Sequence, residues 1–160
     1  MPAAHCQPKR PNVLFLCSKN SCRSQMAEAL LREYAGDEFH IYSAGIEPAE
    51  IHPMVYRVMD EIGVGIDNQR SKTVFEFLGK MHFAYLVTVC PRAEKMCPTF
   101  VGVSYRINWP FEDPAECTGT EQQRLEAFRR VRDQMNAQIL KWLSQLSEKG
   151  LISKINKAKG

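Results

Sequence analysis

The sequence contains no long apolar segment. Its longest apolar runs, such as residues 13–17, are far shorter than the roughly 18 residues that a membrane span requires. The first eleven residues, MPAAHCQPKRP, also lack the apolar stretch of a signal peptide. We therefore expect a cytoplasmic protein that does not act at a membrane.

The chain also lacks a marked excess of charge of one sign. It has 21 basic and 18 acidic residues, and the tail at 148–160, with four lysines and one glutamate, accounts for the whole net charge of +3. Because no basic cluster precedes the tail, we expect no binding to nucleic acid. The tail itself is expected to be a frayed, solvated end rather than an interaction arm.

Glycine and proline, at nine each, are too few for a disordered or collagen-like chain. The six cysteines are too few for a secreted disulfide scaffold, yet more than a cytosolic protein needs for packing, so some of them are expected to do chemistry. A chain of this length can bury a single core. We predict a flexible extension over residues 1–11, one domain over 12–147 and a basic tail over 148–160.

Short apolar runs alternate along the chain with segments of helical periodicity. Strands are predicted at 13–16, 39–42, 83–89 and 103–107, and helices at 26–35, 53–62, 74–78 and 121–149. Thr120 and Gln123 form a capping box before the last helix. This order predicts an α/β fold of three layers, a four-stranded, mainly parallel sheet with helices on both faces. Ligands of such folds bind beyond the carboxyl ends of the strands.

The loop after the first strand carries the pattern C-x5-R, from Cys17 to Arg23. Its backbone N–H groups can surround a tetrahedral oxyanion, to which the helix start adds its positive dipole end and Arg23 a bidentate fork. The same groups favour the thiolate of Cys17, and Ser24 can donate a hydrogen bond to it. Asn20 tolerates the left-handed backbone of a tight bend. The alternative is a buried strand-end cysteine followed by a surface arginine.

Three motifs, CSKNSCRSQMAE, YSAGIEP and WPFEDPA, resemble the thioredoxin-coupled arsenate reductases, which share the low-molecular-weight tyrosine phosphatase fold. The resemblance covers residues 12–146. It implies that Cys17 is the nucleophile and that Ser24 stabilises its thiolate. The oxyanion site that it implies consists of Ser18, Lys19, Asn20, Ser21, Cys22 and Arg23. Lys19 stands where relatives usually carry glycine, so we expect a stiffer loop with a more positive field.

A second pair of cysteines follows the third strand, at Cys90 and Cys97. Reduction of As(V) to As(III) takes two electrons, which two thiols supply when they form a disulfide. We expect Cys90 to attack the Cys17 adduct and expel arsenite, and Cys97 then to attack Cys90 while the intervening segment rearranges. Thioredoxin would reduce the final disulfide, as the resemblance also implies.

The cysteines also allow other interpretations. Four of them could form a structural zinc site, although the spacings are longer than usual and Arg23 is adjacent. The second pair could also be ordinary core thiols. Cys22 could support the loop, pack inertly or form a protective disulfide with Cys17. Cys6 and Cys117 have no matching partner and are expected to be bystanders.

The segment NWPFEDPAE follows the fourth strand and presents Asp113 before Pro114. A carboxylic acid is what the departing oxygen of the oxyanion needs, and the resemblance gives Asp113 the role of general acid. Glu112 is a neighbouring competitor, and a turn-forming Asp-Pro without chemistry is the alternative.

Some relatives bind potassium near the loop through an Asn, a Glu, a Ser and an Asp. The first three match Asn20, Glu28 and Ser43, but Lys72 takes the fourth position. An ammonium group paired with Glu28 would replace the cation, so we expect no potassium requirement. We expect no metal and no cofactor.

The sequence therefore predicts a monomeric arsenate reductase, with phosphate and sulfate as competing oxyanions. A tyrosine or small phosphomonoester phosphatase would need only Cys17, Arg23 and Asp113, but Ala115 stands where phosphatases of this fold usually carry aromatics. A non-catalytic thiol sensor would lose thiols without turnover. Glutaredoxin or another small thiol remains an alternative reductant.

Overall fold

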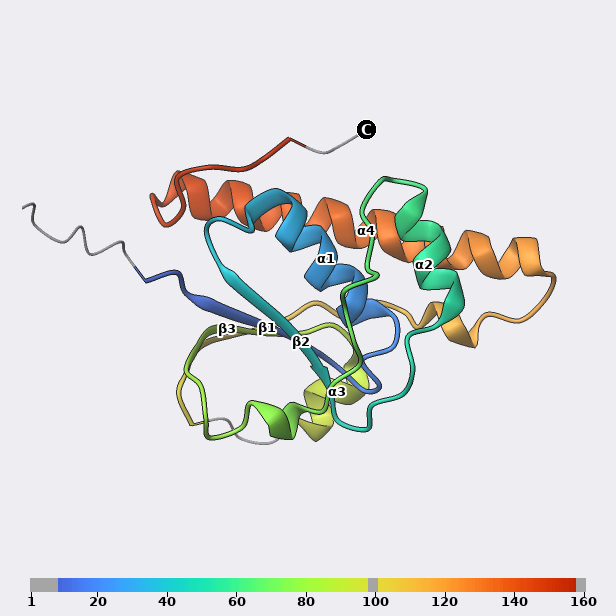
Figure 1. The fold of residues 1–160 in the computed structure, drawn as a ribbon, viewed down its shortest axis with the longest axis horizontal. Coiled ribbons are helices and arrows are strands. Elements are labelled where there is room, and N and C mark those ends of the chain that lie inside the picture. Colours follow the sequence, from blue (N-terminus) through green and yellow to red (C-terminus); the bar gives the residue numbers. More distant parts are fainter. Residues whose placement is uncertain (1–8, 98–100, 158–160) are drawn as a thin grey trace, which may run out of the picture.

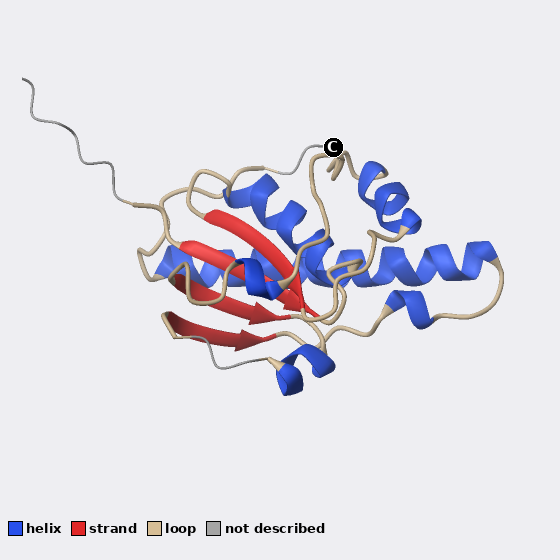
Figure 2. Cartoon of the chain, turned by 60° about the horizontal axis from the view of Figure 1, so that its bottom comes forward, coloured by secondary structure: helices blue, strands red, loops and turns tan. Residues whose placement is uncertain are grey.

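The computed structural model describes residues 9–97 and 101–157, in which four strands form one parallel sheet. The strands are β1 (Asn12–Cys17), β2 (His40–Gly45), β3 (Phe83–Thr88) and β4 (Val103–Asn108). Their order in the sheet is β2-β1-β3-β4 (Figures 1 and 2). The predicted four-stranded parallel sheet is therefore confirmed.

The largest difference from the prediction is at the end of β2, which was expected to end at residue 42. The strand runs on because it pairs with β1 as far as Cys17 opposite Gly45. Ser43, Ala44 and Gly45 have little intrinsic preference for strands, so pairing with a neighbouring strand overrides local propensity here.

Three helices are close to those expected, whereas the segment predicted as a helix at 74–78 forms only a short 3₁₀ helix. The helices are α1 (Arg23–Ala35), α2 (Pro53–Asp60), α3 (Pro91–Met96) and α4 (Glu121–Glu148), with short 3₁₀ helices η1 (Val74–Glu76) and η2 (Pro114–Glu116). The capping box is present, with Gln123 N 3.1 Å from Thr120 Oγ1 and Thr120 N 2.9 Å from Gln123 Oε1. None of the helices in the described ranges is both long and apolar enough to cross a membrane.

The sheet is covered on both faces, which confirms the three layers. Figure 1 shows α1, α2 and α4 on one side of the strands and η1 with α3 on the other. On the first side, the ring of Trp142 from α4 lies 5.1 Å from that of Tyr85 in β3. On the other side, Phe77 after η1 lies 5.4 Å from Tyr42 in β2. Tyr42 and Tyr85 point to opposite faces because side chains alternate along the paired strands.

The described part of the C-terminal tail is held against the domain, contrary to the expected frayed end. Glu38 Oε1 accepts hydrogen bonds from the amides of Ser153 and Lys154, at 3.1 and 2.8 Å, and Asn156 N donates to Tyr34 O at 2.7 Å. Ile152 is buried. The prediction failed because the tail is fixed by contacts with a distant turn, which local composition does not show. Residues 1–8, with Cys6, and 158–160 lie outside the described residues.

The strand order places a topological switch between β1 and β3. The chain passes from β1 to β2 on one side of β1, and then crosses to β3 on the other side. At such a point the connections leave the sheet in opposite directions and open a crevice at the carboxyl ends of the two strands. The ends of β1 and β3 are at Cys17 and Thr88, so both predicted cysteine segments begin at this crevice.

Candidate active site

The loop between β1 and α1 has its carbonyl groups turned outward. Three of them accept hydrogen bonds from backbone amides in the segment that follows β2 (residues 46–52). These pairs are Ser18 O with Glu47 N at 2.9 Å, Lys19 O with Ala49 N at 2.9 Å, and Ser21 O with His52 N at 3.0 Å. Because the N–H of each peptide opposes its carbonyl, this arrangement turns the loop amides toward the centre of the loop.

The interior of the loop is consequently lined with N–H donors. Asn20 has the predicted left-handed backbone, with φ of 52°, and its amide donates to Cys17 Sγ at 3.1 Å. Within the described parts of the chain, the amides of Ser18, Lys19, Ser21 and Cys22 meet no protein acceptor. Together with the N-terminus of α1 they surround a small pocket at Cys17, here called the cradle, whose donors suit a tetrahedral anion.

Gly45 makes the close packing of this loop against β2 sterically feasible. A Cβ atom at Gly45 would lie 2.7 Å from both Asn20 N and Lys19 C, which are backbone atoms. The end of β2 therefore supports the loop from below, at a separation that only glycine permits.

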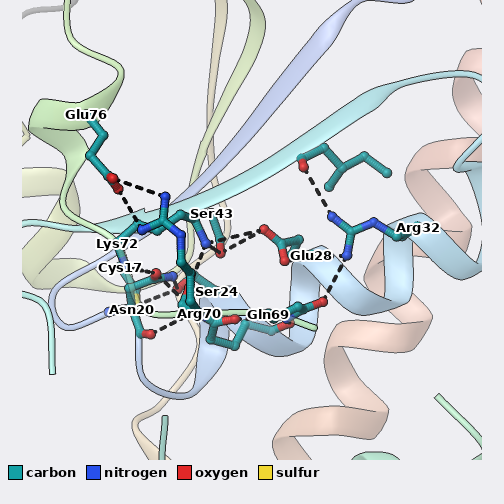
Figure 3. Close-up of polar contacts among 12 residues, drawn as sticks. Cys17, Asn20, Ser24, Glu28, Arg32, Ser43, Gln69, Arg70, Lys72 and Glu76 are labelled. Atoms are coloured by element: carbon teal, nitrogen blue, oxygen red, sulfur yellow. Dashed lines mark hydrogen bonds and ion pairs between the residues drawn. The ribbon is translucent and has the colours of Figure 1, made fainter. Parts of the chain in front are cut away.

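A chain of hydrogen bonds runs from Asn20 through Ser24 to the Cys17 sulfur (Figure 3). Asn20 Nδ2 donates to Ser24 Oγ at 2.8 Å, and Ser24 Oγ lies 2.8 Å from Cys17 Sγ. Asn20 is oriented in turn, since its Oδ1 accepts from Lys72 N at 2.8 Å and from Gln25 Nε2 at 3.0 Å. With Asn20 donating to its oxygen, the Ser24 hydroxyl keeps its own proton available as a hydrogen-bond donor for the Cys17 sulfur.

Arg23 and Asp113 meet at the mouth of the cradle. Arg23 Nη2 lies 3.5 Å from Asp113 Oδ2, and its Nη1 donates to Phe111 O at 2.9 Å. Both side chains line the same pocket as Cys17. Glu112, the competitor for the role of acid, instead pairs with Arg130 at 2.9 Å on the surface and does not line this pocket. The structure thus brings Asp113, rather than Glu112, to the predicted position.

Cys22 lies in the wall of the same pocket, and its side chain is buried. Burial raises the pKa of the Cys22 thiol to about 12, an effect that the neighbouring charge of Asp113 reinforces. Near neutral pH the Cys22 side chain is therefore a neutral thiol and a weak nucleophile. A protective disulfide with Cys17 stays a prediction.

Cys90 and Cys97 lie at the two ends of α3. Val89 N donates to Leu16 O at 2.9 Å, which places Cys90 beside the end of β1, where Cys17 lies. Cys90 is buried, and its sulfur caps α3 by accepting from Ala93 N at 3.3 Å. Cys97 is half-buried, and burial raises its pKa. The structure thus places Cys90 next to the end of β1, although it does not line the Cys17 pocket, and holds Cys97 at the far end of α3.

The four positions compared with a potassium site do come together below the loop (Figure 3). The buried carboxylate of Glu28 accepts from Ser43 Oγ at 3.1 Å and lies 3.7 Å from Lys72 Nζ. The Lys72 backbone amide contacts Asn20, as described above. Burial lowers the pKa of Lys72, and the charge of Glu28 opposes that shift. Among the described residues, no cluster of three or more His, Cys, Asp or Glu side chains could hold a metal.

Two supports of the loop were not identified from the sequence. Gln25 Nε2 donates to Asn20 O and Arg70 O, both at 3.0 Å, and so ties α1 to the segment before η1. The segment 46–52 clamps the loop carbonyls. The motif YSAGIEP includes part of this segment, but its contacts are backbone hydrogen bonds, which residue types do not reveal.

Comparison with known proteins shows a family to which the chain is similar. Residues 12–152 match the family described as low molecular weight phosphotyrosine protein phosphatase. The arsenate reductase of Halalkalibacterium halodurans is 43% identical over 128 residues, covering 79% of this chain and 91% of that protein.

Two solved structures are similar over most of the chain. An arsenate reductase in the phosphate-binding state has a TM-score of 0.72 and 29% identity, covering 84% of this chain and 98% of the other. A thioredoxin-dependent arsenate reductase of Corynebacterium glutamicum has a TM-score of 0.67 and 27% identity, covering 89% of this chain and 64% of the other. The fold predicted by resemblance is confirmed.

The close approach of β2 to the loop predicts the effect of Gly45→Ala. The new methyl group must displace backbone atoms of the cradle, so we expect phosphate to bind about tenfold more weakly and stability to fall by about 1–3 kcal/mol. Calorimetric titration and thermal unfolding measure the two effects. Gly65→Ala is the control, since a Cβ there meets no atom closer than 3.7 Å. Unchanged phosphate binding in Gly45→Ala would contradict the proposed support.

The hydrogen bond from Ser24 predicts slower thiol chemistry in Ser24→Ala. Loss of one donor to a charged sulfur, worth about 1.5–3 kcal/mol, should slow alkylation of Cys17 by iodoacetamide at neutral pH at least tenfold. Peptide mapping measures the rate at this thiol alone. Alkylation of Cys117, a half-buried thiol outside the pocket, serves as an internal control, and equal rates at Cys17 in both proteins would exclude a role for Ser24.

Proposed function

This chain belongs to the low-molecular-weight phosphotyrosine protein phosphatase family, and we propose that it reduces arsenate to arsenite through a relay of Cys17, Cys90 and Cys97. The observation that carries this proposal is the position of Cys90 beside the end of β1, with Cys97 seven residues further on. A phosphatase mechanism has no use for these thiols, whereas a two-electron reduction requires them. The arsenate reductases to which the chain is similar support the same assignment.

In the first step the Cys17 thiolate attacks arsenic. The inward-facing loop amides and the Arg23 guanidinium hold the remaining oxygens and stabilise the charge that develops on them. A sulfur–arsenic bond forms as an arsenic–oxygen bond breaks, and Asp113 protonates the departing oxygen so that it leaves as water. The 3.5 Å separation of Arg23 from Asp113 keeps the acid next to the bound oxyanion.

In the second step Cys90 attacks the Cys17 sulfur. The sulfur–arsenic electron pair stays with arsenic, which leaves as arsenite in the As(III) state, and a Cys17–Cys90 disulfide forms. Two thiols have lost two electrons and arsenic has gained them. The adjacent ends of β1 and β3 bring these two cysteines to one edge of the sheet.

In the third step Cys97 attacks Cys90 and releases Cys17 as a thiolate. With α3 intact, seven positions at about 1.5 Å per residue separate the two Cα atoms by about 10 Å. A disulfide needs roughly 4.4–6.8 Å between Cα atoms, so α3 must unwind. Unwinding also exposes the new disulfide to an external reductant.

We propose thioredoxin as that reductant, and the similarity to a thioredoxin-dependent arsenate reductase supports this choice over glutaredoxin or another small thiol. Phosphate and sulfate should compete with arsenate, because the cradle recognises a tetrahedral anion. The relay begins from free thiols, which a reducing cytoplasm maintains. No part of the mechanism requires a second copy of the chain, so we propose a monomer.

Hydrolysis of phosphate monoesters is the second candidate function. Cys17, Arg23 and Asp113 are sufficient for it, and phosphate has the same shape as arsenate. Ala115, however, is an exposed small residue where phosphatases of this fold usually carry aromatics. We therefore expect phosphatase activity only as a weak side reaction.

The relay predicts that Cys97→Ser loses repeated turnover. In an assay that follows NADPH oxidation with thioredoxin and thioredoxin reductase, arsenate should produce sustained oxidation by the native chain. The variant should stop after one turnover, because Cys17 stays in its disulfide with Cys90. Cys117→Ser, at a thiol outside the pocket, should keep the native rate. The absence of arsenate-dependent oxidation in every protein would exclude the thioredoxin-coupled reductase.

The ammonium group of Lys72 predicts a rate that does not depend on potassium. Lys72 Nζ already lies between Glu28 and Ser43, 3.7 Å from the former and 3.5 Å from the latter. Initial rates of arsenite formation should be the same in potassium and sodium chloride at equal ionic strength. A rate that rises with potassium would show that Lys72 leaves room for the cation.

A further inference from the structure

Glu94 ties the redox helix α3 to the two strands beside it. Its Oε2 accepts a hydrogen bond of 2.5 Å from Thr88 Oγ1, at the end of β3. Its Oε1 lies 3.5 Å from Arg106 Nε in β4, and Arg106 Nη2 donates to the Glu94 backbone carbonyl at 3.1 Å. Both the side chain and the backbone of this one residue are therefore held by the sheet.

Thr88 fixes the inner end of this contact. The residue is fully buried, and its hydroxyl also lies 3.1 Å from Asn108 Oδ1. A hydroxyl has a single proton, and the ionised carboxylate of Glu94 is the strongest acceptor near it. Arg106, whose side chain is 38% exposed, holds the outer side of the Glu94 carboxylate.

A second attachment of α3 is the sulfur of Cys90, which caps the helix through Ala93 N, and Arg92 adds an exposed ion pair with Glu47 at 3.3 Å. This cap is a participant in the proposed reaction. When Cys90 joins Cys17 in a disulfide, its sulfur is drawn toward β1 and is no longer an anionic or thiol acceptor for the helix amides. The N-terminal cap of α3 is thus lost at the step that precedes the arrival of Cys97.

We propose that Glu94 is a positioning residue of the relay, whose contacts with Thr88 and Arg106 hold α3 folded until Cys90 has reacted and whose release lets Cys97 reach Cys90. This inference rests on the proposed function. In the step that it controls, the Cys97 thiolate forms a bond to Cys90 Sγ, and the Cys17–Cys90 bond breaks. Cys17 leaves as a thiolate, the Cys97 proton passes to solvent, and no net oxidation occurs.

The charges around Cys97 also make its reaction depend on the release of Glu94. Burial raises the pKa of Cys97, Arg106 opposes that shift, and Glu94 adds to it. Departure of the Glu94 carboxylate leaves the field of Arg106 unopposed and favours the thiolate that the attack requires. Release of the helix and activation of its cysteine are therefore linked through one carboxylate.

Amide hydrogen exchange in the reduced protein tests the first half of the proposal without any arsenate. Glu94→Gln keeps the shape of the side chain and removes its charge, so the amides of residues 93–97 should exchange about five- to tenfold faster. Arg106→Gln should act in the same direction. Glu121→Gln is the matched control, because it removes an exposed ion pair with Arg57 far from α3. Unchanged exchange in both Glu94→Gln and Arg106→Gln would overturn the proposal.

A single-turnover experiment tests the second half. Reduced protein is mixed with arsenate without reductant and quenched by alkylation, and arsenite and each disulfide are measured over time. In Glu94→Gln, arsenite release should keep its rate, while conversion of the Cys17–Cys90 disulfide to the Cys90–Cys97 disulfide should accelerate about as much as the exchange does. Conversion at the native rate would overturn the role of Glu94. No arsenite from the native chain would instead overturn the proposed function.

Discussion

The hydrogen bonds that hold the loop carbonyls outward are the constraint on which the site depends. The segment 46–52 takes up the carbonyls of Ser18, Lys19 and Ser21, and the loop amides consequently face the Cys17 sulfur. Gly45 allows β2 to approach closely enough for this clamp to form. The anion site therefore belongs to β2 and its following segment as much as to the C-x5-R pattern.

The same sheet edge explains how an oxyanion-binding scaffold can support a reduction. The carboxyl ends of parallel strands lie at one edge of the sheet, so Cys90 after β3 lies at the same edge as Cys17, the proposed nucleophile. α3 separates Cys90 from Cys97, and in the proposed relay it keeps Cys97 away until Cys90 has reacted. A phosphatase completes its reaction at a single cysteine. In the proposed relay the disulfide is passed on to Cys97 when α3 unwinds, and contacts of Glu94 hold this helix in place beforehand.

The sequence was sufficient to predict those elements whose signals are local. The capping box at Thr120, the left-handed Asn20 and the four strands were all predicted and are confirmed. Contacts between distant segments were missed, since the clamp on the loop, the bond from Gln25 to Arg70 O and the docking of the tail leave no local pattern. The structure places Asp113 beside Arg23 as expected, while the catalytic roles of these residues stay predictions.

The most direct test of the account is the stoichiometry of one turnover in the absence of any reductant. Fully reduced protein is mixed with excess arsenate, released arsenite is measured by mass spectrometry of arsenic, and remaining thiols are titrated. The relay predicts one arsenite per chain and the loss of two thiols, with the disulfide found between Cys90 and Cys97. Thiol loss without arsenite, or no change in either, would show that these cysteines do not supply electrons to the bound oxyanion.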